Sequence, residues 1–236
     1  MGQQYILVGV ALALASYISV LKSKLDKGGG AAAFVTGFLI FVGTGWAGLS
    51  LLVSFFLLGT FSTTIGLHKK ARLGLVAVID SKRTAGQVFA NGGGANLLAI
   101  CSIVFPTYHT LLLLMVAAAF SSATADTLSS ELGNLYGKSF YNIITFKKDT
   151  RGLDGVVSIE GTLFGMAGSC IIATVYSCFH GFGTDAFIII LAGTIGNVAD
   201  SILGATAERT KLIGNNVVNF SNTAIGAIAA FVLNLL

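Results

Sequence analysis

Charged residues are scarce in this chain. Asp, Glu, Lys and Arg together make up 10% of its 236 residues, whereas hydrophobic residues make up 54%, and the mean hydropathy is +0.84. An ordinary soluble domain carries about 25% charged residues, because it must cover a surface that faces water. This scarcity excludes a soluble fold and predicts an integral membrane protein. The sequence shows no linker that would divide it, so we predict one all-α transmembrane domain over residues 1–236.

Proline, cysteine and histidine are scarce as well, whereas glycine is abundant. The chain has one proline and three histidines, and the isolation of the histidines excludes the ligand spacing of a zinc site. The three cysteines lie within apolar runs without a CxxC pair, as is typical of small packing residues. Among the thirty glycines, Gly133-x-x-x-Gly137 and Gly161-x-x-x-Gly165 predict close packing of membrane helices.

Eight apolar stretches approach the roughly 20 residues that a helix needs to cross a bilayer. They lie at residues 4–21, 29–43, 46–65, 86–105, 109–127, 161–179, 185–204 and 217–236. The first is expected to be retained as a helix rather than to act as a secretory signal, because its basic charge, at Lys22, follows the apolar run. We therefore predict a polytopic bundle of about eight transmembrane helices, some of them broken at glycines.

The 14 lysine and arginine residues lie in alternate connections. All of them fall between spans one and two, three and four, five and six, or seven and eight, and none lies elsewhere. Basic connections stay on the cytoplasmic side of a membrane. The pattern predicts that both termini are extracytoplasmic, and it accounts for the net charge of +4 without nucleic-acid binding. No transit peptide is visible, and we expect the cell membrane of a bacterium or an archaeon.

The first polar cluster opens the fourth span. It combines two basic and three uncharged polar side chains: Lys82, Arg83, Thr84, Gln87 and Asn91. The last three share a helix face, and the triplet Gly92–Gly94 predicts a helix break that leaves backbone N–H groups free. Basic side chains, amides and free N–H groups suit a phosphate. The alternative is a Lys-Arg pair that only sets topology, followed by a glycine-rich packing helix.

Two acidic clusters end the fifth and seventh spans. Ala125-Asp126-Thr127 is echoed by Ala199-Asp200-Ser201, so that either a weak internal repeat makes the two helix ends face each other or the echo is chance. Asp126 and Glu131 are five residues apart, and they reach one site only if the helix breaks or they serve different partners. Buried carboxylates beside hydroxyl groups suit Mg²⁺. A proton or sodium pathway is the main alternative.

The connection between the fifth and sixth spans is polar and dense in charge of both signs. It carries Lys147, Lys148, Asp154, Ser158 and Glu160. A loop that only connects two helices would not need Asp154, Ser158 and Glu160 where the chain enters the membrane, so we expect this loop to take part in binding.

Five segments, in order, resemble the motifs of the integral-membrane family that contains plant phytyl-phosphate kinase. They are KRTAGQVFANGG (82–93), SATADTLSSELG (122–133), GLDGVVSIEGTLFG (152–165), GNVADSILGAT (196–206) and GNNVVNFSNTAIGA (214–227). They cover roughly residues 80–230, while the first 80 residues match only as hydrophobic spans. The family is distantly similar to CTP-dependent polyprenol and dolichol kinases and to CDP-diacylglycerol synthases.

The resemblance to those enzymes implies CTP-dependent chemistry on a lipid-borne hydroxyl or phosphate. Their pattern of an Asp-rich helix end, a Gly-x-x-x-Gly-Lys run and a Ser-x-Glu-Gly-Thr run is matched here at Asp126, Gly133–Lys138 and Ser158–Thr162. Val157 stands where they carry a lysine, and Lys147 or Lys148 is the candidate to supply that charge.

The function we expect is that of a membrane prenyl-phosphate kinase, which transfers a phosphoryl group from CTP, or another nucleoside triphosphate, to a prenyl or polyprenyl monophosphate. Asp126 and Asp200 are expected to hold Mg²⁺, with Glu131 as a further catalytic candidate. The expected nucleotide and phosphate ligands are Lys82, Arg83, Thr84, Gln87, Asn91, Lys138, Lys147, Lys148, Asp154, Ser158 and Glu160. The expected partners are lipid and nucleotide, with a homodimer left open.

Two other functions are compatible with the same residues. Cytidylyl transfer to a lipid phosphate would release pyrophosphate, whereas the kinase would release CDP. An ion-coupled transporter would also use broken, glycine-rich helices and paired acidic residues, although carriers usually place polar groups across the full membrane depth.

The topology can be tested directly. A reporter that is active only in the cytoplasm should be silent when it is fused to Leu236, because every basic residue lies in an alternate connection. The same reporter fused within the loop that contains Lys147 should be active. Bright signal from the C-terminal fusion would contradict the eight-span arrangement.

Overall fold

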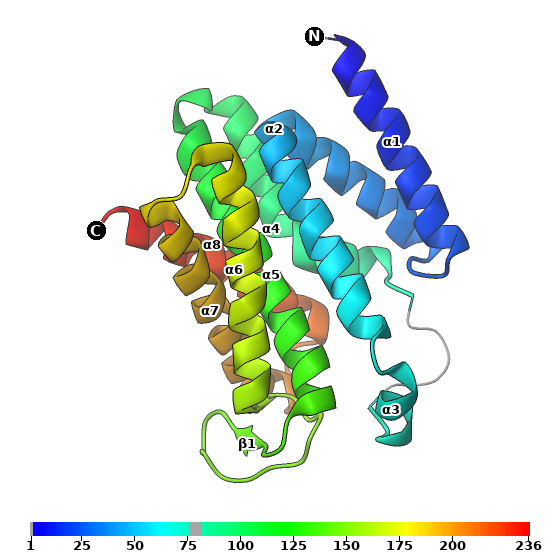
Figure 1. Ribbon diagram of the computed structural model, residues 1–236, viewed down its shortest axis with the longest axis vertical. Coiled ribbons are helices and arrows are strands. Elements are labelled where there is room, and N and C mark those ends of the chain that lie inside the picture. Colours follow the sequence, from blue (N-terminus) through cyan, green and yellow to red (C-terminus); the bar gives the residue numbers. More distant parts are fainter. Residues whose placement is uncertain (1, 76–81) are drawn as a thin grey trace.

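The computed structural model describes residues 2–75 and 82–236 and consists almost entirely of helices (Figure 1). Within this described part, seven helices are long and apolar enough to cross a membrane. They are α1 (Gly2–Leu21), α2 (Lys27–Thr64), α4 (Ala85–Val104), α5 (His109–Tyr136), α6 (Ile159–His180), α7 (Thr184–Leu203) and α8 (Asn215–Asn234). The prediction of an all-α polytopic membrane protein is confirmed.

Shorter elements lie at the ends of these helices. They are α3 (Leu67–Arg72), a 3₁₀ turn (Pro106–Tyr108), a π turn (Gly204–Glu208) and the antiparallel pair β1 (Tyr141–Asn142) and β2 (Val156–Val157). Figure 1 shows α3 and β1 at the same end of the bundle. The polar connections that follow α2 and α5 are therefore on one side.

Helix α2 accounts for two of the predicted spans. It is 38 residues long, and Gly45 interrupts it with φ 66° and ψ −155°, a backbone conformation that is open to glycine and strained for other residues. Figure 1 shows the two halves running in different directions from this point. Residues 27–44 and 46–64 correspond to the predicted spans 29–43 and 46–65, and each half, at about 27 Å, approaches the membrane's hydrocarbon thickness.

Helix α5 is longer than the predicted span 109–127, because its polar residues continue the helix instead of ending it. Thr124 donates to the carbonyl of Phe120 at 2.6 Å, and Thr127 donates to that of Ala123 at 2.8 Å. Hydroxyl groups that bond back to the preceding turn satisfy themselves within the helix. The helix therefore runs to Tyr136.

The predicted helix break at Gly92–Gly94 is wrong, since α4 runs without interruption through the triplet. These glycines instead make room for neighbouring helices. A Cβ atom at Gly92 would lie 3.0 Å from Cγ2 of Thr36 in α2, and one at Gly93 would lie 3.3 Å from the Phe220 ring in α8. The triplet is a packing surface, so the glycine-rich packing helix named in the alternative interpretation is the structure found here.

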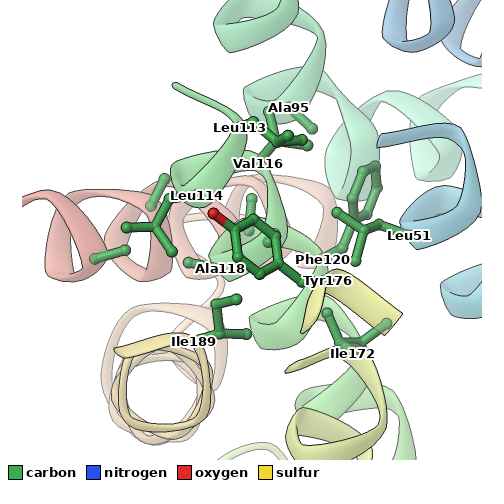
Figure 2. Close-up of a cluster of buried hydrophobic side chains, with 14 of the residues drawn as sticks. Leu51, Ala95, Leu113, Leu114, Val116, Ala118, Phe120, Ile172, Tyr176 and Ile189 are labelled. Carbon is green, nitrogen blue, oxygen red and sulfur yellow. The ribbon is translucent and has the colours of Figure 1, made fainter. Parts of the chain in front are cut away.

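Helix α5 is the centre of the bundle and contacts α2, α4, α6, α7 and α8. Around its first half, Phe120, Ile172 and Tyr176 belong to one apolar cluster, in which Figure 2 shows side chains from several helices meeting. Further along, α5 and α6 approach so closely that a Cβ at Gly133 would lie 2.7 Å from Cα of Gly161. The predicted glycine-mediated packing of these segments is confirmed.

The connections at the polar end are tied together by Arg209. Its Nη1 donates to Oδ2 of Asp149 at 2.9 Å and its Nη2 to the carbonyl of Asp154 at 2.7 Å. The hydrogen bond from Arg209 lowers the pKa of Asp149 from its usual value. The loop after α5 is thereby held against the end of α7.

Candidate active site

Two carboxyl groups meet between α5 and α7. Asp126 and Asp200 lie within hydrogen-bonding reach of each other, and both line one cavity of about 210 Å³. The echoed sequence segments are therefore brought face to face by the fold. No ion pair between described residues involves either carboxyl group.

This carboxylate cavity is lined by acidic, hydroxyl and amide groups. Its polar lining residues are Asp126, Ser129, Ser130, Asn134, Asp154, Ser158, Thr162, Thr194, Asn197, Asp200, Ser201, Glu208, Asn215 and Asn219. Asp154 and Ser158, which the sequence predicted as nucleotide or phosphate ligands, thus line the same cavity as Asp126. Ser158 also caps α6, since its hydroxyl accepts a hydrogen bond from the N–H of Gly161 at 3.1 Å.

Asparagine side chains fix the surroundings of the two carboxyl groups. Asn222 donates to Oδ2 of Asp200 at 3.3 Å and accepts a short hydrogen bond from Ser122. On the other side of the cavity, Ser129 donates to Oδ1 of Asn197 at 3.1 Å. Helices α5, α7 and α8 are therefore linked by hydrogen bonds around the carboxylates.

A second cavity, of about 410 Å³, adjoins the first and carries basic groups. The two cavities share Asp126, Ser130, Asn215 and Asn219. The basic cavity is further lined by Lys24, Lys82, Arg83, Gln87, Asn91 and Glu131, together with threonines of α2. Asp126 consequently lies on the boundary between an acidic space and a basic one.

Arg83 is the most constrained of these cations. Its guanidinium packs against Gly59 of α2 and lies 5.8 Å from the centre of the Phe55 ring. Burial lowers the pKa of Arg83 from its usual value, and the charge of Glu131 opposes that change. An arginine stays protonated under such conditions, so this partly buried cation favours an anionic ligand.

Thr84 and Gln87 have a structural role at the start of α4. The Thr84 hydroxyl accepts from the N–H of Gln87 at 3.4 Å, and Oε1 of Gln87 accepts from the N–H of Thr84 at 2.9 Å. This reciprocal capping box satisfies two N–H groups that would otherwise be free. Asn91 donates to the carbonyl of Gln87 at 3.0 Å, and Gln87 and Asn91 still line the basic cavity.

Glu131 faces a different partner from Asp126. Its Oε2 accepts from Nζ of Lys70 in α3 at 2.6 Å, and Lys70, which is only 2% exposed, also donates to the carbonyl of Ser62 at 2.7 Å. Helix α5 is continuous, so the two carboxyl groups serve separate partners, although both line the basic cavity. Glu131 holds α3 against α5.

Four predicted ligands lie away from both cavities. Lys138, Lys147 and Lys148 are exposed on the loop after α5, and Glu160 lies in the first turn of α6. None of them lines the carboxylate cavity or the basic cavity.

Several lining residues were not among the predicted ligands. They are Lys24, Asn197, Glu208, Asn215 and Asn219. Four of them lie within or beside the segments 196–206 and 214–227, and the asparagines of those segments could have been predicted as lining residues from the motifs. The position of Lys24 could not be predicted in this way, because it lies beside Arg83 through a contact between distant parts of the chain.

Comparison with known sequences assigns the chain to a family. The family described as integral membrane protein DUF92 matches residues 10–227. The chain belongs to this family. The match begins well before residue 80, so the relationship extends to the first spans, where the motifs gave no resemblance.

Relatives occur in plants, cyanobacteria and archaea. The chain is 34% identical to Protein VTE6, chloroplastic, of Arabidopsis thaliana, over 91% of this chain and 66% of that protein. An uncharacterized membrane protein of Methanocaldococcus jannaschii is 34% identical over 89% of this chain and 87% of its own length. Protein PGR of Arabidopsis thaliana is 28% identical over 85% of this chain and 80% of its length. No solved structure matches the chain.

The carboxylate pair of this DUF92 protein suits a magnesium ion. Adjoining carboxyl groups repel each other when both are ionised, unless a proton or a cation lies between them. Within residues 2–75 and 82–236, no group of three acidic, histidine or cysteine side chains that could hold a metal ion is found. Mg²⁺ commonly takes one or two carboxylates and completes its shell with water and substrate phosphates, so Asp126 and Asp200 are the residues that could hold it.

Magnesium should stabilise the protein through this pair. We expect Mg²⁺ to raise the melting temperature of the wild type relative to EDTA, by the equivalent of about 2.7 kcal/mol at 100 times its Kd. Asp126→Asn and Asp200→Asn should abolish the increase and melt in EDTA no lower than the wild type, since one of two like charges is gone.

Glu131→Gln is the matched control for this experiment. It leaves Lys70 without its carboxylate partner, so it should lower the melting temperature in EDTA and in Mg²⁺ alike while keeping the response to magnesium. A full magnesium response in Asp126→Asn or Asp200→Asn would remove that residue from the site.

Proposed function

We propose that this DUF92 protein is a membrane prenyl-phosphate kinase that uses a nucleoside triphosphate, by resemblance CTP. The observation that carries the proposal is the position of Asp126 between a carboxylate cavity and a basic cavity. A reaction between two phosphate-bearing substrates needs basic side chains that bind the phosphates next to carboxylates that bind a metal ion. The motif resemblance to the family of plant phytyl-phosphate kinase and the similarity to Protein VTE6 over most of this chain support it.

The proposed reaction balances without a catalytic base. An oxygen of the prenyl monophosphate forms a bond to the γ-phosphorus of the nucleotide, while the bond from that phosphorus to the β–γ bridging oxygen breaks. The products are a prenyl diphosphate and a nucleoside diphosphate, CDP if the donor is CTP. The acceptor oxygen is already anionic, so no proton has to be removed. Phosphoryl transfer then asks the protein mainly for positioning and for charge stabilisation.

The residues around the two cavities fit that task. Asp126 and Asp200 would hold Mg²⁺, which when bound neutralises charge on the phosphate oxygens. Arg83 and Lys24 would bind phosphate from the basic cavity. Ser129, Asn197 and Asn222 fix the carboxylate side through the hydrogen bonds described above. The rigid amide network would keep the carboxyl groups oriented as the substrates enter.

The proposed active site faces the cytoplasm. Helix α3 and the β1–β2 loop lie at the same end of the bundle, and both belong to basic connections. Basic connections are retained in the cytoplasm, where nucleoside triphosphates are available. The host membrane would be that of a bacterium or an archaeon, or an organelle membrane such as the name of the chloroplastic relative indicates.

An ion-coupled carrier fits the interior less well. Toward the opposite end of the bundle, Tyr176 donates to Asp185 at 2.9 Å. Phe120, Ile172 and Ile189, all with 0% exposure, belong to the apolar cluster that surrounds Tyr176 (Figure 2). A close-packed apolar layer opposes the passage of ions, because a charge there would lose its hydration without a partner.

The proposal predicts a defined product. Purified protein with Mg²⁺, CTP labelled at the γ-phosphorus and a prenyl monophosphate should give labelled prenyl diphosphate and unlabelled CDP. Asp126→Asn and Asp200→Asn should lower kcat by at least about a hundredfold, because charge stabilisation at phosphate oxygens is worth several kcal/mol.

Lys148→Gln is the control, because Lys148 is exposed and lines neither cavity. It should retain the activity of the wild type. Release of labelled pyrophosphate would show cytidylyl transfer instead. Failure of every nucleotide to donate to any prenyl monophosphate, in protein that binds magnesium, would overturn the proposed function.

A further inference from the structure

An apolar groove lies between α1, α2 and the start of α4. It has a free volume of about 120 Å³, and its walls include Leu12 and Ala15 of α1, Ala33 and Leu52 of α2 and Val88 of α4. Apart from Val8, the described residues of α1 are exposed or half-buried, and this helix packs mainly against α2. One wall of the groove is therefore a helix at the edge of the bundle, next to lipid.

The groove adjoins the basic cavity. Phe55, Arg83, Gln87 and Asn91 line both spaces. Arg83 thus lies where an apolar space meets a polar one, and Asp126 lines the same polar space. A ligand with one anionic end and one apolar end matches this sequence of surfaces.

The backbone of Arg83 is fixed at this junction by residues 24–26. The N–H of Arg83 donates to the carbonyl of Lys24 at 3.0 Å, and the N–H of Asp26 donates to the carbonyl of Arg83 at 3.1 Å. Leu25, only 2% exposed, forms a parallel bridge with Arg83. These backbone bonds fix where the side chain of Arg83 begins, and its guanidinium packs against Gly59 and the Phe55 ring.

The side chain of Arg83 has no hydrogen-bonding partner of its own among the described residues. No ion pair among those residues involves Arg83. Glu131, the acidic residue whose charge acts on the pKa of Arg83, forms its ion pair with Lys70. A partly buried cation in this position is stabilised by an anion that brings two or more oxygens. A phosphate monoester has that geometry.

We propose that this groove holds the head-proximal part of the acceptor's prenyl chain, with the phosphate on Arg83 and directed toward Asp126. The inference rests on the proposed function and makes Arg83 a ligand of the lipid acceptor rather than of the nucleotide. A dry cavity of roughly 150 Å³ accommodates benzene, so this groove encloses the first isoprenoid units only. The rest of the chain lies along α1 in the lipid, and chains of different length bind alike.

The experiment compares phenylalanine substitutions on one helix. Ala15 lines the groove, whereas Ala13 is exposed on another face of α1 and does not. Binding of geranyl and geranylgeranyl monophosphate to protein in nanodiscs is measured without nucleotide. Ala15→Phe should weaken the binding of both lipids about tenfold, since the new ring displaces roughly two methylenes of the prenyl chain from the groove. Ala33→Phe, in α2, should have the same effect. Ala13→Phe should bind like the wild type.

The role of Arg83 is tested by comparing lipids with and without the phosphate. Arg83→Gln should weaken the binding of geranylgeranyl monophosphate about tenfold or more, as expected for a lost charge-assisted contact. It should leave the binding of geranylgeraniol unchanged. CTP with Mg²⁺ should raise the melting temperature of the wild type, and this rise should persist in Ala15→Phe and in Arg83→Gln.

The outcomes separate this inference from the proposed function. If the wild type transfers no phosphoryl group but the binding pattern holds, the kinase proposal fails and the groove stands. If the wild type is a kinase while Ala15→Phe and Ala33→Phe bind both lipids normally, or no more weakly than Ala13→Phe, the groove proposal is overturned. Loss of nucleotide binding in Arg83→Gln with normal lipid binding would also overturn it.

Discussion

The meeting of Asp126 and Asp200 inside a helix bundle is the contact on which the rest of this structure depends. Two carboxyl groups held together inside a helix bundle are unfavourable without a cation or a proton between them. The neighbouring helices are arranged to hold them there: glycines let α6 approach α5 to backbone contact, and Asn222 of α8 bonds to Asp200. Holding the two carboxyl groups together therefore lowers the stability of the fold, unless a cation or a proton relieves their repulsion.

The charges around this site are divided between structure and binding. Lys70 and Glu131 neutralise each other and hold α3 to α5, while Arg209 is occupied by Asp149 and the Asp154 carbonyl. Arg83 has no such partner among the residues that the structure describes, and it lines one cavity together with Asp126. A cation and a carboxylate that line the same space are what two phosphate-bearing substrates and Mg²⁺ would need.

The sequence predicted most of the architecture, since hydrophobic length and basic connections are local properties. The spans at 86–105, 161–179 and 185–204 differ from α4, α6 and α7 by one or two residues at each end. The echo around Asp126 and Asp200 left open whether the two helix ends face each other, and the structure brings the two residues to one cavity. Glycine was harder to interpret, because Gly45 breaks a helix whereas Gly92–Gly94 pack within one, and only the neighbouring helix decides which. The partners of Glu131 and Arg83 depend on contacts across more than fifty residues, which no local pattern contains.

Electron paramagnetic resonance of Mn²⁺, bound in place of Mg²⁺, tests the central claim most directly. With protein, CTP and a non-reactive prenyl phosphonate, the account predicts a bound ion with ³¹P couplings from both the nucleotide and the lipid. Asp126→Asn or Asp200→Asn should remove those couplings. A protein-bound ion that shows no phosphorus coupling, or whose couplings survive both substitutions, would contradict a metal site shared by two phosphate substrates between α5 and α7.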